Sequence, residues 1–187
     1  METRSLSELL AAVYRGDQAR VDELLADDPE LNVFEAAALG HVERLEQLLD
    51  AEPALVSAWA EDGFTPLHLA SFFRHPAAAR FLVERGALVD VVARNEELQV
   101  TPLQSAAASR EEETAALLLE RGADPNVQQR GGFTALHAAA QNGDGPLAEL
   151  LVVHGADRTI TADDGRTAAD FARDAGHDSL AARLALQ

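Results

Sequence analysis

Residues 64–75 read FTPLHLASFFRH, and the core of this stretch, Thr65-Pro66-Leu67-His68, recurs along the chain. Related tetrapeptides begin at Thr101, Thr134 and Thr167, which gives intervals of 36, 33 and 33 residues. Twenty-one residues after each of the first three threonines, an apolar run ends in a Gly-Ala pair; the pairs are Gly86-Ala87, Gly122-Ala123 and Gly155-Ala156. A sustained period of this length indicates helical units that bury their faces against one another.

Two earlier copies have lost the opening motif but keep its later landmarks. Gly40-His41 and Gly16-Asp17 stand where Gly143-Asp144 stands further along, which sets the starts of these copies at Leu31 and Ser7. The starts are only 24 residues apart, so the first copy lacks a full connecting loop. We expect one domain over residues 1–187, with units at about 5–30, 31–60, 61–96, 97–129, 130–162 and 163–187, the first and last being polar caps.

These copies resemble the ankyrin repeat, whose pattern reads TPLHxAAxxGH, then an apolar second helix, then GADxN. The closest matches are FTPLHLASFFRH at 64–75, FTALHAAAQNGD at 133–144 and LLLERGADPN at 117–126, and the resemblance covers nearly the whole chain. It implies an all-α solenoid of about six stacked helix-turn-helix units with β-hairpin-like finger loops.

Local chemistry favours the same units. Threonine is a good N-cap and proline is tolerated at the first helical position, so Thr65-Pro66 and Thr101-Pro102 should begin helices. Arg74 and Arg110 depart from the family pattern, because glycine belongs at that turn. A left-handed backbone at a non-glycine residue costs on the order of 1 kcal/mol, so either the turn is rebuilt there or the strain is carried.

Composition excludes several classes of partner. The formal net charge of −17 would repel nucleic acid phosphates and anionic lipid headgroups. No apolar stretch reaches the roughly 18 residues of a membrane span, and the N-terminus has no uninterrupted apolar signal core. The absence of cysteine excludes disulfides, Cys-based zinc sites and a thiol nucleophile. We expect an acidic monomer in the cytoplasm.

The histidines and acids are the candidates for a catalytic or metal site. For His68 and His137, the family resemblance implies a structural imidazole bonded to the motif threonine and to backbone. No GxSxG, HExxH, P-loop or GxGxxG motif occurs. One repeat position holds Asp17, His41, His75, Glu111, Asp144 and His177. Neighbours in this column are expected roughly 8 to 10 Å apart, too far to share a metal, so we interpret them as solvated turn residues. No catalytic, cofactor or metal-binding residue is predicted.

A partner-binding surface is the remaining specialised feature. In ankyrin-like stacks the finger loops and the last turn of each first helix form the concave face, and exposed aromatic residues and arginines mark binding sites. The candidates at or near these positions are Tyr14, Trp59, Phe64, Phe72, Phe73, Arg94, Asn95, Arg130, Phe133, Gln141 and Asn142. Alternatively, Phe64 and Phe133 stiffen fingers and Phe72 partly fills the core. The third finger, residues 92–99, is three residues longer than its counterparts, so Arg94 and Asn95 provide either specificity or an insertion of no consequence.

The function predicted from these features is that of a scaffold or adaptor. It would bind a protein partner on its concave face without cofactor, and acids such as Glu61 and Asp62 favour a partner with a basic and apolar surface. A dedicated inhibitor or assembly factor of a specific enzyme is an alternative that the sequence does not separate from this one. An enzyme without a recognisable motif is a further alternative, which a deep polar cleft with convergent titratable groups would favour.

Overall fold

The computed structural model describes residues 7–95 and 97–185, so the ends of the predicted caps and Glu96 of the third finger lie outside the described residues. Within these ranges the chain forms twelve α-helices, a 3-10 helix and no named strand. The helices are α1 Glu8–Arg15, α2 Gln18–Leu25, α3 Val33–Leu39, α4 Val42–Ala51, η1 Pro53–Ser57, α5 Pro66–Phe72, α6 Pro76–Glu84, α7 Pro102–Ser109, α8 Glu112–Glu120, α9 Ala135–Gln141, α10 Gly145–Val153, α11 Ala168–Asp174 and α12 Asp178–Ala185.

The motif threonines begin the first helices of the last four repeats, and the helix starts predicted at Thr65 and Thr101 are confirmed. The Thr101 hydroxyl accepts from the Gln104 amide at 3.3 Å, and the Thr167 hydroxyl accepts from the Asp170 amide at 3.4 Å. Pro66 occupies the first position of α5, where its missing N–H leaves no bond unmade. Because the side chain of the third helical residue returns a bond to the threonine amide, each helix start is closed from both sides.

The core repeats with the sequence. Leu67, Leu103 and Leu136 hold one position in successive first helices and are buried. Leucines at one position of the second helices, and alanines in both helices, are likewise buried; they are Leu82, Leu118, Leu151, Ala70, Ala106, Ala139, Ala79, Ala115 and Ala148. Alanine lets neighbouring helices approach closely, while each buried leucine contributes about 2 to 3 kcal/mol of transfer free energy. The repeats therefore share one continuous core.

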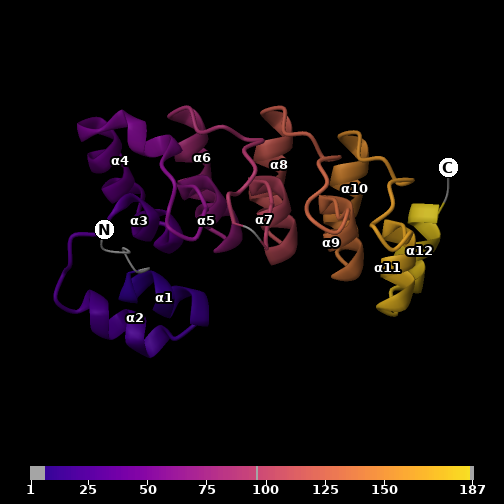
Figure 1. The fold of residues 1–187 in the computed structure, drawn as a ribbon, viewed down its shortest axis with the longest axis horizontal. Coiled ribbons are helices and arrows are strands. Elements are labelled where there is room, and N and C mark those ends of the chain that lie inside the picture. Colours follow the sequence, from indigo (N-terminus) through magenta and orange to yellow (C-terminus); the bar gives the residue numbers. More distant parts are fainter. Residues whose placement is uncertain (1–6, 96, 186–187) are drawn as a thin grey trace.

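The helix pairs from α3/α4 to α11/α12 stand side by side in a row (Figure 1). The first helices contact one another in the order α3, α5, α7, α9, α11, and α4, α6, α8 and α10 form a second layer with the same order. The predicted all-α solenoid is confirmed.

Finger loops connect each second helix to the next first helix. The backbone closes them from Ala60 N–H to Phe64 C=O, from Gln129 N–H to Phe133 C=O and from Ala162 N–H to Arg166 C=O, at 2.8 to 2.9 Å. In the longer third finger the corresponding bond joins Ala93 and Val100, also at 2.8 Å. An isolated antiparallel bridge between Thr161 and Thr167 is the extent of β-structure in the described ranges, so the hairpin-like character of the fingers stays a prediction.

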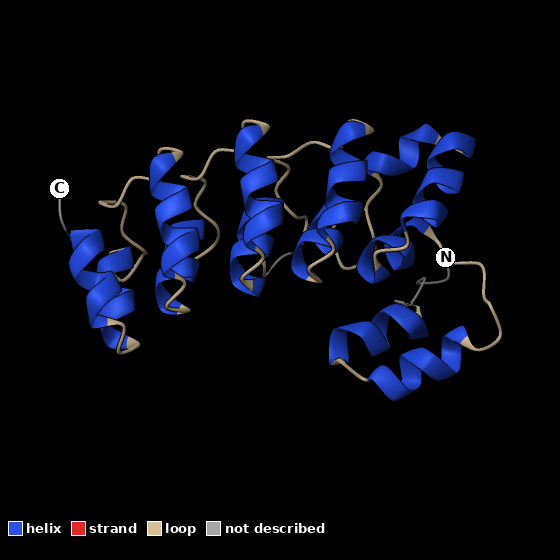
Figure 2. Ribbon diagram, turned by 180° about the vertical axis from the view of Figure 1, so that it is seen from behind, coloured by secondary structure: helices blue, strands red, loops and turns tan. Residues whose placement is uncertain are grey.

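The first helix pair is turned away from the row. Figures 1 and 2 show α1 and α2 beneath α3, on the side of the first helices, connected to α3 by an extended loop. The short connector noted in the sequence carries no finger that could align this pair with the next. α1 instead packs against α3, and its end reaches the third unit, where Tyr14 contacts Asp62 and Phe73.

Candidate functional site

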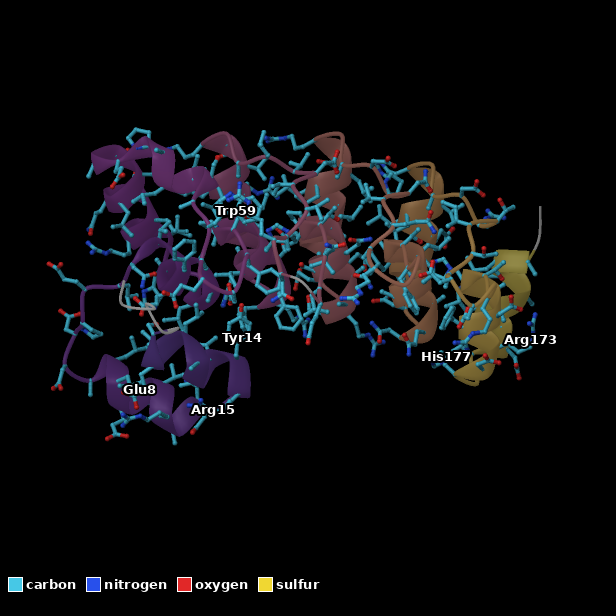
Figure 3. The ribbon with its side chains drawn as sticks, in the orientation of Figure 1. Glu8, Tyr14, Arg15, Trp59, Arg173 and His177 are labelled. Atoms are coloured by element: carbon cyan, nitrogen blue, oxygen red, sulfur yellow. The ribbon has the colours of Figure 1, made fainter. Side chains whose placement is uncertain are left out.

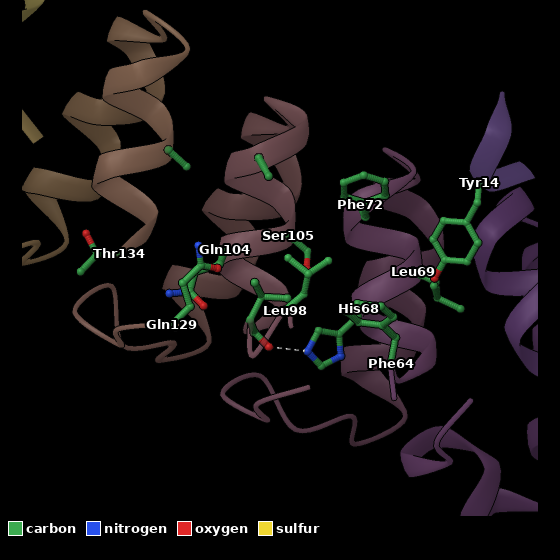
Figure 4. Close-up of a pocket in the computed structure, with 13 residues that line it drawn as sticks. Tyr14, Phe64, His68, Leu69, Phe72, Leu98, Gln104, Ser105, Gln129 and Thr134 are labelled. Atoms are coloured by element: carbon green, nitrogen blue, oxygen red, sulfur yellow. Dashed lines mark hydrogen bonds between the residues drawn. The ribbon is translucent and has the colours of Figure 1, made fainter. Parts of the chain in front are cut away.

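A hollow of about 350 Å³ lies between the end of α1, the finger loops and the helices α5, α7 and α9 (Figure 4). Its lining is mainly apolar and comes from four of the six units, the first, third, fourth and fifth. The lining residues are Tyr14, Phe64, His68, Leu69, Phe72, Leu98, Val100, Gln104, Ser105, Ala108, Gln129, Thr134 and Ala138. We call this hollow the groove. Of the residues predicted to bind a partner, it brings together Tyr14, Phe64 and Phe72.

Tyr14 closes one end of the groove. Its hydroxyl donates to Asp62 Oδ2 at 2.7 Å, and its ring meets Phe73 edge to face, with centroids 5.2 Å apart. Burial, together with the hydrogen bond to Asp62, raises the pKa of Tyr14 above its ordinary value, so the phenol stays neutral and remains a donor. The contact joins residues 48 apart in the chain and fixes α1 over the second finger.

Two large apolar side chains line the groove and are also exposed to solvent. Phe72, near the end of α5, is 44% exposed, and Leu98, in the third finger, is 53% exposed. Phe72 therefore does not fill the core, whereas Phe73 is half-buried beneath it with ring centroids 5.2 Å apart. Phe64 is also half-buried and lies tilted against the His68 ring.

The floor of the groove contains a buried imidazole with no free polar atom. His68 Nδ1 lies 3.2 Å from the Thr65 amide, which can only donate, so Nδ1 is the acceptor and Nε2 donates to the Val100 carbonyl at 3.0 Å. Burial lowers the pKa of His68 to about 4, so the ring is neutral at physiological pH. His137 repeats these contacts with Thr134 and with the Arg166 carbonyl. The structural role expected for both histidines is confirmed.

Several of the residues predicted to bind a partner contact other parts of the protein. The Arg94 guanidinium stacks 4.1 Å above the Trp59 ring, outside the groove, and both residues line a separate hollow beside the connectors. Asn95 donates to the Asp62 carbonyl at 2.9 Å, which ties the third finger to the second. Phe133 packs against Phe171 at 5.1 Å, so it contacts the next repeat.

The remaining candidates lie at the rim or beyond it. Gln141 is exposed at the end of α9, and Arg130 is exposed in the fourth finger. Asn142 caps α9 and donates to the Ala107 carbonyl of the preceding repeat at 3.3 Å. These three residues do not line the groove.

Sequence reasoning missed part of the lining. Leu98 and Val100 come from the enlarged third finger, and Ala108 and Ala138 leave the space that makes the surface hollow. The unusual length of that finger marks it as a candidate binding loop. The residues predicted from it are Arg94 and Asn95, whereas the lining residue is Leu98.

The turns at Arg74 and Arg110 keep the left-handed backbone, with φ of 64° and 60°, so the strain is carried rather than removed. Arg74 Nε lies 3.2 Å from Glu111 Oε2, and Arg110 Nε lies 3.9 Å from Asp144 Oδ2. Each arginine thus pairs with an acid in the following repeat.

The column of turn residues is less solvated than predicted. His75 Nε2 donates to the Ala38 carbonyl of the preceding repeat at 3.0 Å, and Glu111 is only 9% exposed, so for these two the expectation is wrong. The cause is packing between repeats, which covers the turns. Across residues 7–95 and 97–185, no three His, Asp or Glu side chains gather closely enough to hold a metal ion.

Comparison with known proteins gives consistent matches along the chain. A family model for ankyrin repeats in three copies matches residues 9–95 and 33–129, and one for ankyrin repeats in many copies matches 118–172. A protein of Oryza sativa subsp. japonica, described as the probable E3 ubiquitin-protein ligase XBOS31, is 38% identical over 81 residues. That alignment covers 43% of this chain and 18% of the rice protein. In the part of the chain that the structure describes, no helix is long and apolar enough to cross a bilayer.

Proposed function

Since this chain belongs to the ankyrin repeat family, whose repeats form protein–protein interaction modules, we propose that it is a non-catalytic adaptor that holds a protein partner in the groove. The observation that carries the proposal is the pair Phe72 and Leu98, two large apolar side chains that stay exposed while facing one hollow. Contiguous exposed apolar surface of this kind usually marks an interaction site.

The chemistry of the groove favours binding over catalysis. Its titratable side chains are His68, which is neutral and bonded at both ring nitrogens, and Tyr14, whose hydroxyl is bonded to Asp62. Neither can act as a proton acceptor at neutral pH, and the groove offers no base beside a nucleophile. Ser105 donates to the Thr101 carbonyl at 3.1 Å and is not activated by a neighbouring histidine.

The proposal includes a partner with a basic and apolar surface, and a chain that acts as a cytoplasmic monomer. The net charge of −17 supports a partner with a basic surface, because an acidic surface attracts cationic partners and repels anionic ones. The ligase activity in the name of the rice protein forms no part of the proposal, since the similarity spans less than a fifth of that protein.

Affinity capture with matched variants tests the proposal. Phe72→Ser/Leu98→Ser removes the exposed apolar pair and should reduce capture of partner proteins from an extract of the source organism at least about tenfold, because central apolar contacts each contribute about 1 kcal/mol or more. Leu88→Ser/Val153→Ser removes two other exposed apolar side chains, 65% and 76% exposed, that lie outside the groove.

The control variant should capture the same proteins as the wild type. Circular dichroism establishes that both variants remain helical. If the groove variant captures the wild-type set undiminished, or if the control loses it equally, the partner does not bind in the groove.

A further inference from the structure

Most polar side chains that line the groove are already engaged inside the protein; in the part of the chain that the structure describes, the Gln129 side-chain amide is the exception. His68 is bonded at both ring nitrogens, and Gln104 accepts from the Thr101 amide and donates to the Val127 carbonyl at 2.7 Å. Ser105 donates to a backbone carbonyl, and the Thr134 hydroxyl contacts His137 Nδ1 at 2.9 Å. Apart from Gln129, a polar ligand would lose its hydration here without gaining partners, so the groove favours an apolar group.

The shape of the groove suits one bulky side chain. Tyr14 lies at one end of the lining and Phe72 and Leu98 lie nearer its middle (Figure 4), and the small residues Ala108 and Ala138 also line the hollow. A volume of about 350 Å³ is at the lower end of the range for small-molecule sites. Burial of one apolar side chain supports affinity only in roughly the millimolar range or weaker, so the group must be attached to a chain that makes further contacts.

The surroundings of the groove are acidic. Glu61 lies in the finger that leads to Phe64, and Glu97 directly precedes Leu98; both are exposed, and neither carboxylate forms a salt bridge with the residues that the structure describes. Two of the cations at helix ends near the groove are paired, Arg74 with Glu111 and Arg110 with Asp144. Positive charge on the ligand would therefore be attracted to Glu61 and Glu97.

From these three features we propose that the groove binds an arginine- or lysine-containing segment of a protein partner, and that one bulky apolar residue of this segment enters the space between Phe72, Leu98 and Ala108. The inference rests on the proposed function and names the chemistry of the partner. Tyr14 sets the limit of the site, since a side chain that enters the hollow meets its ring and cannot continue toward α2.

Selection from a random peptide library displayed on phage tests this inference, with the purified chain as bait. Enriched peptides should contain a Leu, Met, Phe or Trp flanked by Arg or Lys, and the synthesised peptides should bind the wild type more weakly as salt rises. Ala108→Leu fills the hollow from an exposed helical position and should weaken binding at least about tenfold. Ala77→Leu, also exposed but on α6 and outside the groove, should leave the affinity within about twofold of the wild type.

The inference is overturned if the enriched peptides lack the apolar residue or the positive charge, if no peptide is enriched, or if Ala108→Leu binds them as tightly as the wild type. Capture of whole partner proteins by the Phe72→Ser/Leu98→Ser variant then distinguishes failure of the ligand chemistry from failure of the proposed function. If capture still depends on Phe72 and Leu98, the proposed function stands and only the ligand chemistry is wrong. If it does not, the groove is not the partner site.

Discussion

At the scale of single residues, one position shows how the repeats reuse a contact with different side chains. His68, Gln104 and His137 each follow a helix-capping threonine, return a bond to its amide and donate to a carbonyl of the next finger. The family resemblance implied the histidine contacts. It did not reveal that Gln104 makes equivalent ones, because the match depends on where the following finger passes.

Replacement of His68 by glutamine should make stability less dependent on pH. In the folded chain the pKa of His68 is about 4, against 6.5 for the free side chain, so between these values the unfolded state binds more protons and stability falls as pH falls. The loss from this group between about pH 7 and about pH 5 is about 2 kcal/mol. Urea unfolding at both pH values should show that loss reduced in His68→Gln.

The reciprocal variant provides a check on this explanation. Gln104→His introduces a buried imidazole beside Thr101 and should increase the loss of stability on acidification. Equal pH dependence in the wild type and in His68→Gln would show that this imidazole is not the group responsible.

At the scale of elements, the turn between the two helices of a repeat is matched to the repeat that follows. At Gly40 a Cβ atom would lie 2.5 Å from His75 Nδ1, and at Gly143 it would overlap the His177 ring. Where the turn holds Arg74 or Arg110, the next repeat supplies an acid instead of a histidine. A glycine at the turn, as at Gly40 and Gly143, thus faces a histidine ring of the next repeat, whereas an arginine at the turn pairs with a carboxylate of the next repeat. The sequence indicates that both arginines are unusual at this turn but not which residues they pair with, because those partners depend on the register between repeats.

Replacing the glycine by alanine at two turns should distinguish the cost of backbone strain in unfolding free energy from the cost of a clash with the next repeat. Gly16 and Gly40 both have positive φ, 66° and 72°, but a Cβ at Gly16 meets nothing within 4 Å. Gly16→Ala should cost about 1 kcal/mol of unfolding free energy from strain alone. Gly40→Ala should cost about 2 kcal/mol or more, because the His75 ring must move and its bond to the Ala38 carbonyl is lost.

Urea unfolding of the two variants measures this difference. Adding His75→Ala to each background should bring the costs of the two alanines close together, since the ring is then absent. Equal costs without that change would mean that the turn and the following repeat are not coupled.

At the scale of the whole molecule, the sequence predicts the row of repeats better than the surface they create. The 33-residue period, the threonine caps and the small residues of the first helices predict the helices and their order, because these are local or repeating features. The groove depends on contacts between distant segments. Tyr14 reaches Asp62 across 48 residues, and that contact places α1 against the third unit.

The candidate site illustrates the same limit. Tyr14, Phe64 and Phe72, three of the residues predicted to bind a partner, line the groove, while Trp59 pairs with Arg94 elsewhere. An aromatic residue at a finger position can face a partner or a neighbouring finger, and only the path of the enlarged third finger decides between the two. Periodicity carries no information about that path, since the finger departs from the repeat.

Photo-crosslinking from within the groove tests the central claim most directly. Benzoylphenylalanine in place of Phe72 keeps an aromatic ring at an exposed position of the groove, and the same group in place of Val153 lies on α10, outside it. On irradiation in an extract of the source organism, we predict discrete protein adducts from position 72 that position 153 does not form. Adducts from position 153 alone, or the same adducts from both positions, would contradict the account.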